Sequence, residues 1–347
     1  MAMDRDRETF GPRELAICLS HFDLGVINKI EEFARGSRRA PKIVLECDRG
    51  KFLFKRRAKG KDDLAKVAFT HQLQLTLAGQ NFPLPHLLGT RKDNNSMLVQ
   101  ESSIYEMFEY IDGGPYDGSL EATFSAGRIL GLYHKLLADF RSDYSPPIGS
   151  YHDAKAIHQA IRNTVGSLPA ETRPTKDILT STVEYLEGAY QTCAQQANEL
   201  GLDKWGLQIV HGDWHPGNML FADRQVVAVI DYDAARLQQR VIDLANGALQ
   251  FSIIGGSEDP AKWPEYVDET RFKRFLRGYD SVNVVSVAEI KSVPFLMCEA
   301  MIAEAVLPIA ATGSFGRIDG FPFLQMIGRK VKWILDNMQE LCAALGQ

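Results

Sequence analysis

The feature that most constrains this chain is the polar run HGDWHPGN at residues 211–218, followed by IDYD at residues 230–233. The apolar segment 226–230 precedes the second motif and is typical of a buried strand, so Asp231 is expected at the end of that strand. Asp213, Asn218 and Asp231 would then lie on two adjacent loops. In the alternative interpretation, Asp213 and Asn218 cap a turn and Asp231 ends a strand in solvent.

Two carboxylates and an amide in this order are the groups that phosphoryl transfer requires. The transferred group needs little covalent help, so a protein mainly places an acceptor hydroxyl in line and neutralises charge with metal ions. Asp213 would accept a hydrogen bond from the hydroxyl. The amide oxygen of Asn218 and the carboxylate of Asp231 would bind Mg²⁺, a hard cation that prefers oxygen ligands.

The signature His-x-Asp, with Asn five residues after the Asp and then Ile-Asp-[Phe/Tyr]-[Asp/Glu], resembles that of the aminoglycoside phosphotransferase, choline kinase and homoserine kinase-type family. Members of that family look like small-molecule relatives of protein kinases. The resemblance implies ATP and Mg²⁺ as cofactors, Asp213 as the catalytic base, and Asn218 and Asp231 as metal ligands. It also implies three supporting residues, of which the last is expected to brace the catalytic loop: His211, Asp233 and Asp243.

The same resemblance implies a nucleotide-binding lobe in the amino-terminal part. Residues 43–47 and 51–56 predict two strands joined by a hairpin turn. Lys55 follows an apolar run and takes the place of the lysine that pairs with the α- and β-phosphates; its rivals are Lys51, Arg56 and Arg57. In the preceding loop, Gly36 and Ser37 offer backbone N–H groups to a phosphate, with an exposed basic turn as the alternative.

The helix after Lys55 departs from the family pattern. Family members usually present a glutamate to the lysine, but residues 64–77 contain no acidic residue. We therefore expect Lys55 to lack a carboxylate partner until a phosphate binds, with His71 or Gln72 as substitute hydrogen-bonding groups. A position on the helix surface is the other interpretation of His71.

The expected fold class is α+β, a bilobal protein-kinase-like fold. A small antiparallel-sheet lobe would occupy residues 1–110, and a larger, mainly helical lobe residues 111–347. Segments 97–100 and 104–111 predict an antiparallel pair that ends at a hinge near 109–114. By resemblance, backbone groups of Glu109 and Ile111 would contact adenine there. Helical patterns cover 123–140, 154–165, 177–200, 241–254, 270–279, 287–310 and 324–345.

Composition narrows the class of protein. A net charge of −5 does not favour nucleic acid as a partner. Five scattered cysteines without metal-ligand spacing favour a reducing cytoplasm and argue against a disulfide scaffold or a zinc site. The amino terminus lacks an apolar signal core, and Glu299 and Glu304 interrupt the most apolar helix, so no membrane span is expected.

The sequence therefore predicts a cytoplasmic kinase that transfers the γ-phosphate of ATP to a hydroxyl of a small metabolite, with an amine as an optional second group. The acidic and aromatic segment 257–269 could attract and cover an amine, although a solvated acidic loop is the plainer account. Two alternatives stay open on the sequence: a stress-response-type protein kinase of the same fold, and a nucleotide-binding pseudokinase that regulates a partner.

Three further residues near the motifs are candidates for contact with the acceptor. Trp214 would either wall the acceptor pocket or pack the catalytic loop. Arg236 and Arg240 follow the second motif closely enough to reach an anionic substrate, although an ion pair between Arg240 and Asp243 is the plainer expectation.

Overall fold

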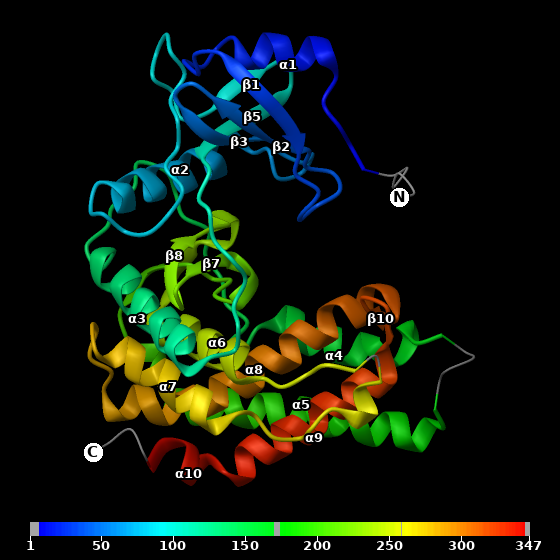
Figure 1. Ribbon diagram of the computed structural model, residues 1–347. Helices are drawn as coiled ribbons and strands as arrows, with labels where there is room; N and C mark the ends of the chain where they lie inside the picture. Colours follow the sequence, from blue (N-terminus) through cyan, green and yellow to red (C-terminus); the bar gives the residue numbers. More distant parts are fainter. Residues whose placement is uncertain (1–6, 170–173, 258, 344–347) are drawn as a thin grey trace.

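The computed structural model describes residues 7–169, 174–257 and 259–343, and it has the two expected lobes (Figure 1). The amino-terminal lobe is a five-stranded antiparallel sheet in the order β1-β2-β3-β5-β4, with a short helix on one face. The predicted strand pairs are confirmed; α1 and β1 had no clear sequence signal. The elements of this part are α1 (Pro12–Leu19), β1 (Ile27–Glu32), β2 (Lys42–Cys47), β3 (Gly50–Arg56), α2 (Leu64–Ala78), β4 (Leu98–Gln100) and β5 (Ser103–Glu109).

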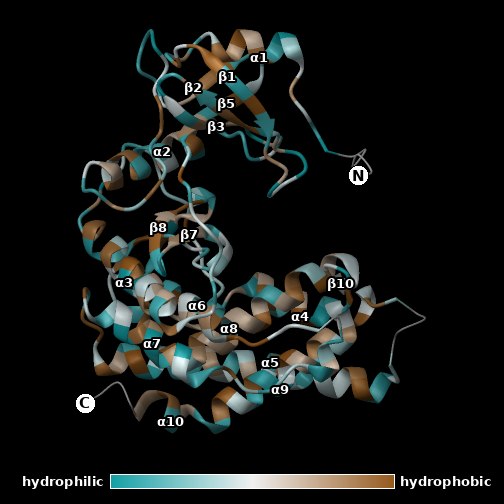
Figure 2. Ribbon diagram, viewed as in Figure 1, coloured by the Kyte–Doolittle hydropathy of each residue, from teal (hydrophilic) through white to brown (hydrophobic). Residues whose placement is uncertain are grey.

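The alternation of side chains along β3 explains how the sheet serves a site. Phe52 and Phe54 point into the core that the sheet forms with α1, and the ring of Phe54 stacks on Tyr105. Because successive strand residues face opposite sides, Lys55 projects from the face that α1 does not cover. Figure 2 shows hydrophobic residues along the strands of this sheet. The apolar run before Lys55 therefore fixes which way the lysine points.

The carboxy-terminal lobe is mainly helical, with short antiparallel pairs β6–β9, β7–β8 and β10–β11. The predicted helix at 324–345 is two helices in the described part, because the first ends before Asn337; residues 344 and 345 lie outside it. The elements are α3 (Leu120–Leu136), α4 (Lys155–Ser167), α5 (Lys176–Glu199), β6 (Leu207–Val210), β7 (Met219–Ala222), β8 (Gln225–Val229), β9 (Arg236–Gln239), α6 (Arg240–Ser252), α7 (Glu269–Asp280), α8 (Val287–Thr312), β10 (Ser314–Phe315), β11 (Ile318–Asp319), α9 (Gly320–Asp336) and α10 (Met338–Ala343).

Helix α8 lies at the centre of this lobe and packs against α4, α5, α6 and α9. Among the described residues it is the one helix long and apolar enough to cross a membrane, but 78% of its most apolar window is buried inside the protein. That burial is what a core helix of a two-lobed protein requires. Two glutamates on it, Glu299 and Glu304, become important for the site.

The hydrophobic core of the helical lobe extends into the amino-terminal part. Phe69, Leu73 and Leu77 of α2 belong to the same cluster as the buried residues of α3, α6 and α8. The sheet and α1 form a separate, smaller cluster. Helix α2 therefore packs mainly on the large lobe and also contacts the turn that follows β8. It joins the two lobes at the level of the predicted site.

Candidate active site

The structure places Asp213 and Asn218 side by side on the loop between β6 and β7. The Asn218 amide nitrogen donates to Asp213 Oδ2 at 2.9 Å and to the Asp213 carbonyl oxygen at 3.0 Å. Since the nitrogen carries both bonds, the amide oxygen of Asn218 is the atom available to a metal ion. Asp213 likewise keeps Oδ1 for another partner. The spacing of five residues thus leaves two free oxygens, the amide oxygen of Asn218 and Oδ1 of Asp213, for different partners.

Asp231 lies just beyond the end of β8, separated from Val229 by Ile230, close to where the sequence predicted it. Its backbone adopts the left-handed conformation, with φ of 63°, and the residue is exposed. Two hydrogen bonds tie this segment to the catalytic loop: Ile230 N–H donates to the Asn218 carbonyl oxygen at 2.9 Å, and His211 Nε2 lies 3.3 Å from the Ile230 carbonyl oxygen. The two motifs therefore form one unit.

Asp243, at the start of α6, braces the catalytic loop. Its carboxylate accepts the backbone N–H groups of His211 at 2.9 Å and Gly212 at 3.0 Å, and it lies 3.2 Å from His134 Nε2. Gly212 has φ of +75°, and a Cβ atom there would meet the Ala234 carbonyl oxygen. The loop can therefore take this path only with glycine at that position. Asp243 thus makes the contacts expected of a brace, and buried His134 lies against the same carboxylate.

His211 is fully buried within the same unit. Burial lowers the pKa of its imidazole, so the ring is neutral and can donate from Nε2 to the Ile230 carbonyl oxygen. Its role is to hold the strand end that carries Asp231. That position agrees with the supporting role expected from the motif.

Sequence reasoning missed His215, which lies beside the carboxylate of Asp213. Its Nε2 is 3.5 Å from Asp213 Oδ2, while its Nδ1 accepts the N–H of Gly217 at 3.0 Å. The bond to Asp213 raises the pKa of His215. Burial alone would raise the pKa of Asp213, but His215 and the Asn218 amide outweigh it and lower that pKa. Asp213 is therefore ionised and able to accept a hydrogen bond. The signal was the histidine two residues after Asp213.

Lys55 has a carboxylate partner, so the expectation of an unpaired lysine is wrong. Lys55 Nζ lies 3.5 Å from Glu106 Oε2, and the two residues are opposite each other in the β3–β5 register. Glu106 is fully buried. Burial would raise its pKa, but the positive charge of Lys55 and the other cations around it hold that pKa well below its usual range. A neighbouring strand thus supplies the glutamate that the helix lacks.

His71 is buried, so its interpretation as a surface histidine is wrong. Its Nε2 lies 2.7 Å from Glu106 Oε1 and its Nδ1 lies 2.9 Å from the Ser96 hydroxyl. It supports the partner of Lys55 and does not replace it. Gln72 instead bonds to Ser142 and Asp143, away from the lysine.

Lys42 is a second lysine that sequence reasoning missed. It pairs with Lys55 across the β2–β3 register, and its amine donates to the Arg35 carbonyl oxygen at 3.1 Å. Burial and the charge of Lys55 lower its pKa, and the negative charge of Asp231 opposes that shift. Lys42 therefore lies within electrostatic reach of both Lys55 and Asp231. The hairpin register around residues 48–50 could have identified it.

The predicted phosphate lid lies between β1 and β2. Gly36 has φ of +79°, and a Cβ atom on it would come within 2.7 Å of Lys42 Nζ. The lid backbone therefore passes close to that lysine. Ser37 uses its hydroxyl to accept the N–H of Arg39 at 3.3 Å. Contact of Gly36 and Ser37 with phosphate remains a prediction.

The hinge residues follow the end of β5. Glu109 N–H donates to the His86 carbonyl oxygen at 2.8 Å, and Tyr110 N–H donates to the Lys51 carbonyl oxygen at 2.9 Å. Because the N–H of Glu109 is already used, its carbonyl oxygen would be the atom that accepts a hydrogen bond from adenine, and the N–H of Ile111 would donate one to adenine. That assignment also remains a prediction.

Of the three predicted acceptor contacts, Trp214 and Arg240 face elsewhere, and Arg236 stays a prediction. Trp214 is fully buried against Tyr133 and His211, so it packs the catalytic loop and does not wall a pocket. Arg236 donates to the Ala234 carbonyl oxygen at 2.9 Å. The expected pair of Arg240 with Asp243 is wrong, because the guanidinium of Arg240 makes a two-point bond to the carboxylate of Glu289 on α8.

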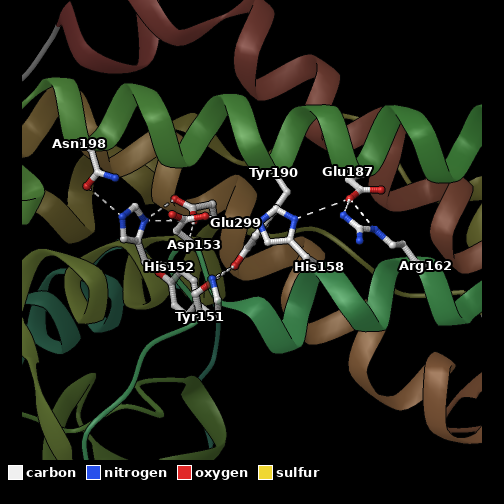
Figure 3. A network of polar contacts seen from close by, with 10 residues as sticks. Tyr151, His152, Asp153, His158, Arg162, Glu187, Tyr190, Asn198 and Glu299 are labelled. Atoms are coloured by element: carbon white, nitrogen blue, oxygen red, sulfur yellow. Dashed lines mark hydrogen bonds and ion pairs between the residues drawn. The ribbon is translucent and has the colours of Figure 1, made fainter.

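Two glutamates of α8 have different environments. Glu299 is fully buried and lies 2.9 Å from His152 Nδ1, and this pair fastens the segment before α4 to α5 and α8 (Figure 3). Glu304 reaches solvent, and the Gln250 amide of α6 donates to both of its carboxylate oxygens. Partial desolvation of the carboxylate by the surrounding protein, with the negative charge of Asp213, raises the pKa of Glu304 to about 7. Glu304 therefore lies on the catalytic side of α8.

The metal assignment yields a direct test. We expect Asp231→Ala to raise the Mg²⁺ concentration needed for nucleotide binding steeply, and Asn218→Ala to raise it less, because a neutral amide contributes less charge. Titration of Mg²⁺ against nucleotide affinity measures both. Asp223→Ala is the matched control, since Asp223 is also exposed and also has positive φ, but lies in the β7–β8 turn. Nucleotide affinity in the wild type that does not depend on metal would contradict the assignment.

Comparison with known proteins agrees with this geometry. A family model described as the phosphotransferase enzyme family matches residues 29–282, more than half of the chain. A search among curated proteins gives no significant match.

Solved structures with the same fold include several small-molecule kinases. An aminoglycoside phosphotransferase from Alicyclobacillus acidocaldarius is 16% identical, with 99% of this chain and 98% of that chain covered and a TM-score of 0.68. A microcompartment-associated aminopropanol kinase is 13% identical (94% and 97% covered, TM-score 0.68). The amicoumacin kinase hAmiN, in complex with AMP-PNP, Ca²⁺ and Ami, is 11% identical (94% of each chain covered, TM-score 0.66). These similarities confirm the protein-kinase-like fold.

Proposed function

We propose, because this chain belongs to the phosphotransferase enzyme family, that it transfers the γ-phosphate of ATP to a hydroxyl of a small, amine-bearing metabolite. The observation that carries the proposal is the environment of Asp213. One carboxylate oxygen is held by Asn218 and faces His215, and the other is left for an acceptor hydroxyl. The neighbours that act on aminopropanol, aminoglycosides and amicoumacin support a small acceptor.

The residues divide the work of phosphoryl transfer. Asp213 accepts the hydrogen bond of the acceptor hydroxyl, orients its oxygen toward the phosphate and takes its proton as the new bond forms. Lys55 and Lys42 offer positive charge to the phosphates from the floor of the sheet. Asn218 and Asp231 would hold a divalent ion, which neutralises phosphate charge when bound.

Asn218 and Asp231 fit a divalent ion, although they are only two protein ligands. Among the described residues, no three His, Cys, Asp or Glu side chains gather as a metal cluster. One carboxylate, one amide oxygen and the phosphates themselves form the usual environment of Mg²⁺ in nucleotide sites. The free amide oxygen of Asn218 is the structural observation that supports this fit.

The amine in the proposed acceptor rests on Glu304. Its carboxylate is close enough to Asp213 and His215 for their charges to act on it, and Gln250 fixes its orientation. Arg240 is bound by Glu289, which leaves Arg236, whose Nε–H donates to the Ala234 carbonyl oxygen, as the candidate for an anionic acceptor.

The pseudokinase alternative loses its main support, because Glu106 supplies the carboxylate that the helix lacks. The remaining test is a panel of amino alcohols, amino sugars, amino acids and unmodified sugars, assayed for phosphorylated product with ATP and Mg²⁺. Product from an amine-bearing alcohol supports the proposal. Nucleotide binding without product from any acceptor would favour a regulator, and product from a protein substrate alone would favour the protein-kinase alternative.

Glu304 also sets a pH dependence for an amine acceptor. The ammonium group binds the ionised carboxylate, so the KM of the acceptor should fall as pH rises through about 7 in the wild type. Glu304→Gln should raise that KM about tenfold at pH 8 and remove its pH dependence, with little effect on the KM of ATP. Glu340→Gln is the control of equal charge, on α10 at the far side of the lobe (Figure 1). An unchanged acceptor KM in Glu304→Gln would sink the assignment.

A further inference from the structure

Arg57, the first residue after β3, connects the two lobes. Its Nη1 donates to Asp233 Oδ1 at 2.9 Å, and its Nη2 donates to Glu106 Oε1 at 2.7 Å. Only 6% of its side chain is exposed. Asp233 belongs to the short turn Tyr232–Ala234 of the large lobe, two residues after Asp231. One guanidinium therefore bridges a carboxylate of the sheet and a carboxylate of the metal-site turn.

This bridge is one end of a continuous polar chain. Lys55 contacts Glu106, Glu106 contacts Arg57, and Arg57 contacts Asp233. His71 of α2 supports the middle of the chain through Glu106, and α2 itself packs against the turn that contains Asp233. The phosphate-binding lysine and the metal-site turn are thus linked through three contacts between charged side chains.

The shape and charge of the guanidinium of Arg57 fix the geometry of this link. The guanidinium is planar and holds its two carboxylates in a fixed geometry, which a lysine amine would not do. Glu106 is fully buried, so it needs its cations. When a phosphate attracts Lys55 away from Glu106, Arg57 becomes the main cation beside that carboxylate, and the planar guanidinium held there keeps its second bond to Asp233 in place. Low exposure protects these bonds from screening by salt.

We propose that Arg57 is a positioning residue, whose bond to Asp233 couples nucleotide binding at Lys55 to metal binding at Asp231. The inference rests on the proposed function for the identity of the two ligands. It does not require that any acceptor has been found. Arg57 itself contacts neither the reacting atoms nor the metal ligands in this arrangement.

The test is the effect of Mg²⁺ on nucleotide affinity in the full chain. Calorimetry gives the dissociation constant of AMP-PNP with and without Mg²⁺, and the ratio of the two constants measures coupling. We expect Asp233→Asn to reduce that ratio about tenfold with the melting temperature of the nucleotide-free protein nearly unchanged. Lys61→Ala is the matched control: its amine lies 4.0 Å from Asp233 Oδ2 but is mostly exposed, so the ratio should stay at the wild-type value.

Two further variants keep the test decisive if Asp233→Asn folds poorly. Arg57→Lys keeps the charge but cannot bridge two carboxylates, and it should lose the same coupling. Arg57→Gln combined with Asp233→Asn should lose no more coupling than Arg57→Gln alone, because Arg57→Gln already removes the bond to Asp233. A wild-type ratio in either Asp233→Asn or Arg57→Lys, or an additive loss in the double variant, would overturn the proposal. Failure of the proposed function would appear separately, as absence of phosphorylated product despite normal coupling.

Discussion

Asp213→Asn is expected to lower kcat by about a thousandfold while leaving the nucleotide dissociation constant near the wild-type value. The substitution keeps the shape of the side chain and one oxygen for the acceptor, but it removes the negative charge that takes the hydroxyl proton. The nucleotide should be unaffected, because its contacts are assigned to Lys55, Lys42, Asn218 and Asp231. Single-turnover transfer and calorimetric binding measure the two effects separately.

The control for this variant is its fold, because Asn218 donates to the Asp213 carboxylate. The Asp213 carbonyl oxygen accepts the same amide, so part of the contact survives in Asp213→Asn. An unfolding transition close to wild type is therefore expected. Turnover within a few-fold of wild type would show that Asp213 is not the base.

Glu106→Gln should cost the nucleotide-free protein about 3–5 kcal/mol of unfolding free energy. Glu106 is fully buried and contacts Lys55, Arg57 and His71. A neutral amide in its place would leave the guanidinium of Arg57, with 6% of its side chain exposed, beside a group that cannot balance its charge. Urea unfolding of the two proteins measures the loss.

Lys55→Met is the control for Glu106→Gln, because it removes one cation beside Glu106 and keeps the carboxylate. Lys55 is partly exposed, and Glu106 keeps Arg57 and His71 when the lysine is removed. We expect a stability loss below about 1 kcal/mol together with weakened nucleotide affinity. If Lys55→Met destabilises the protein as much as Glu106→Gln, the ion pair between them holds the sheet together, and Lys55 is mainly structural.

Much of the fold followed from local patterns. The alternation in 51–56 and the turn residues at 48–50 predicted the β2–β3 hairpin, and the helical periods predicted most helices of the large lobe. The prediction of a single helix at 324–345 was wrong, because the chain turns at Asn337 although the helical pattern of the sequence continues through it. α1 and β1 carried too little periodicity to be recognised.

The catalytic unit was the most predictable part because its members are close in the sequence. Asp213 and Asn218 share one loop, and Asp231 ends the next hairpin, so their proximity needs only short-range geometry. Asp243 lies further along the chain, and its brace role followed from the family motif. His215 was inside the same run of residues, and only its distance from Asp213 shows what it does.

The sequence by itself determined which side chains form this site, since Asp213, Asn218 and Asp231 lie at short fixed spacings on one loop and the hairpin that follows it. Tertiary structure alone decided what each distant charge does. Glu106 lies 49 residues from Arg57 along the chain, and Asp233 lies 176 residues from it. Only strand register and the packing of the two lobes bring these three residues together. A missing glutamate in one helix therefore said nothing about the partner of Lys55, because a partly buried lysine can take its negative partner from any element that brings a carboxylate beside it.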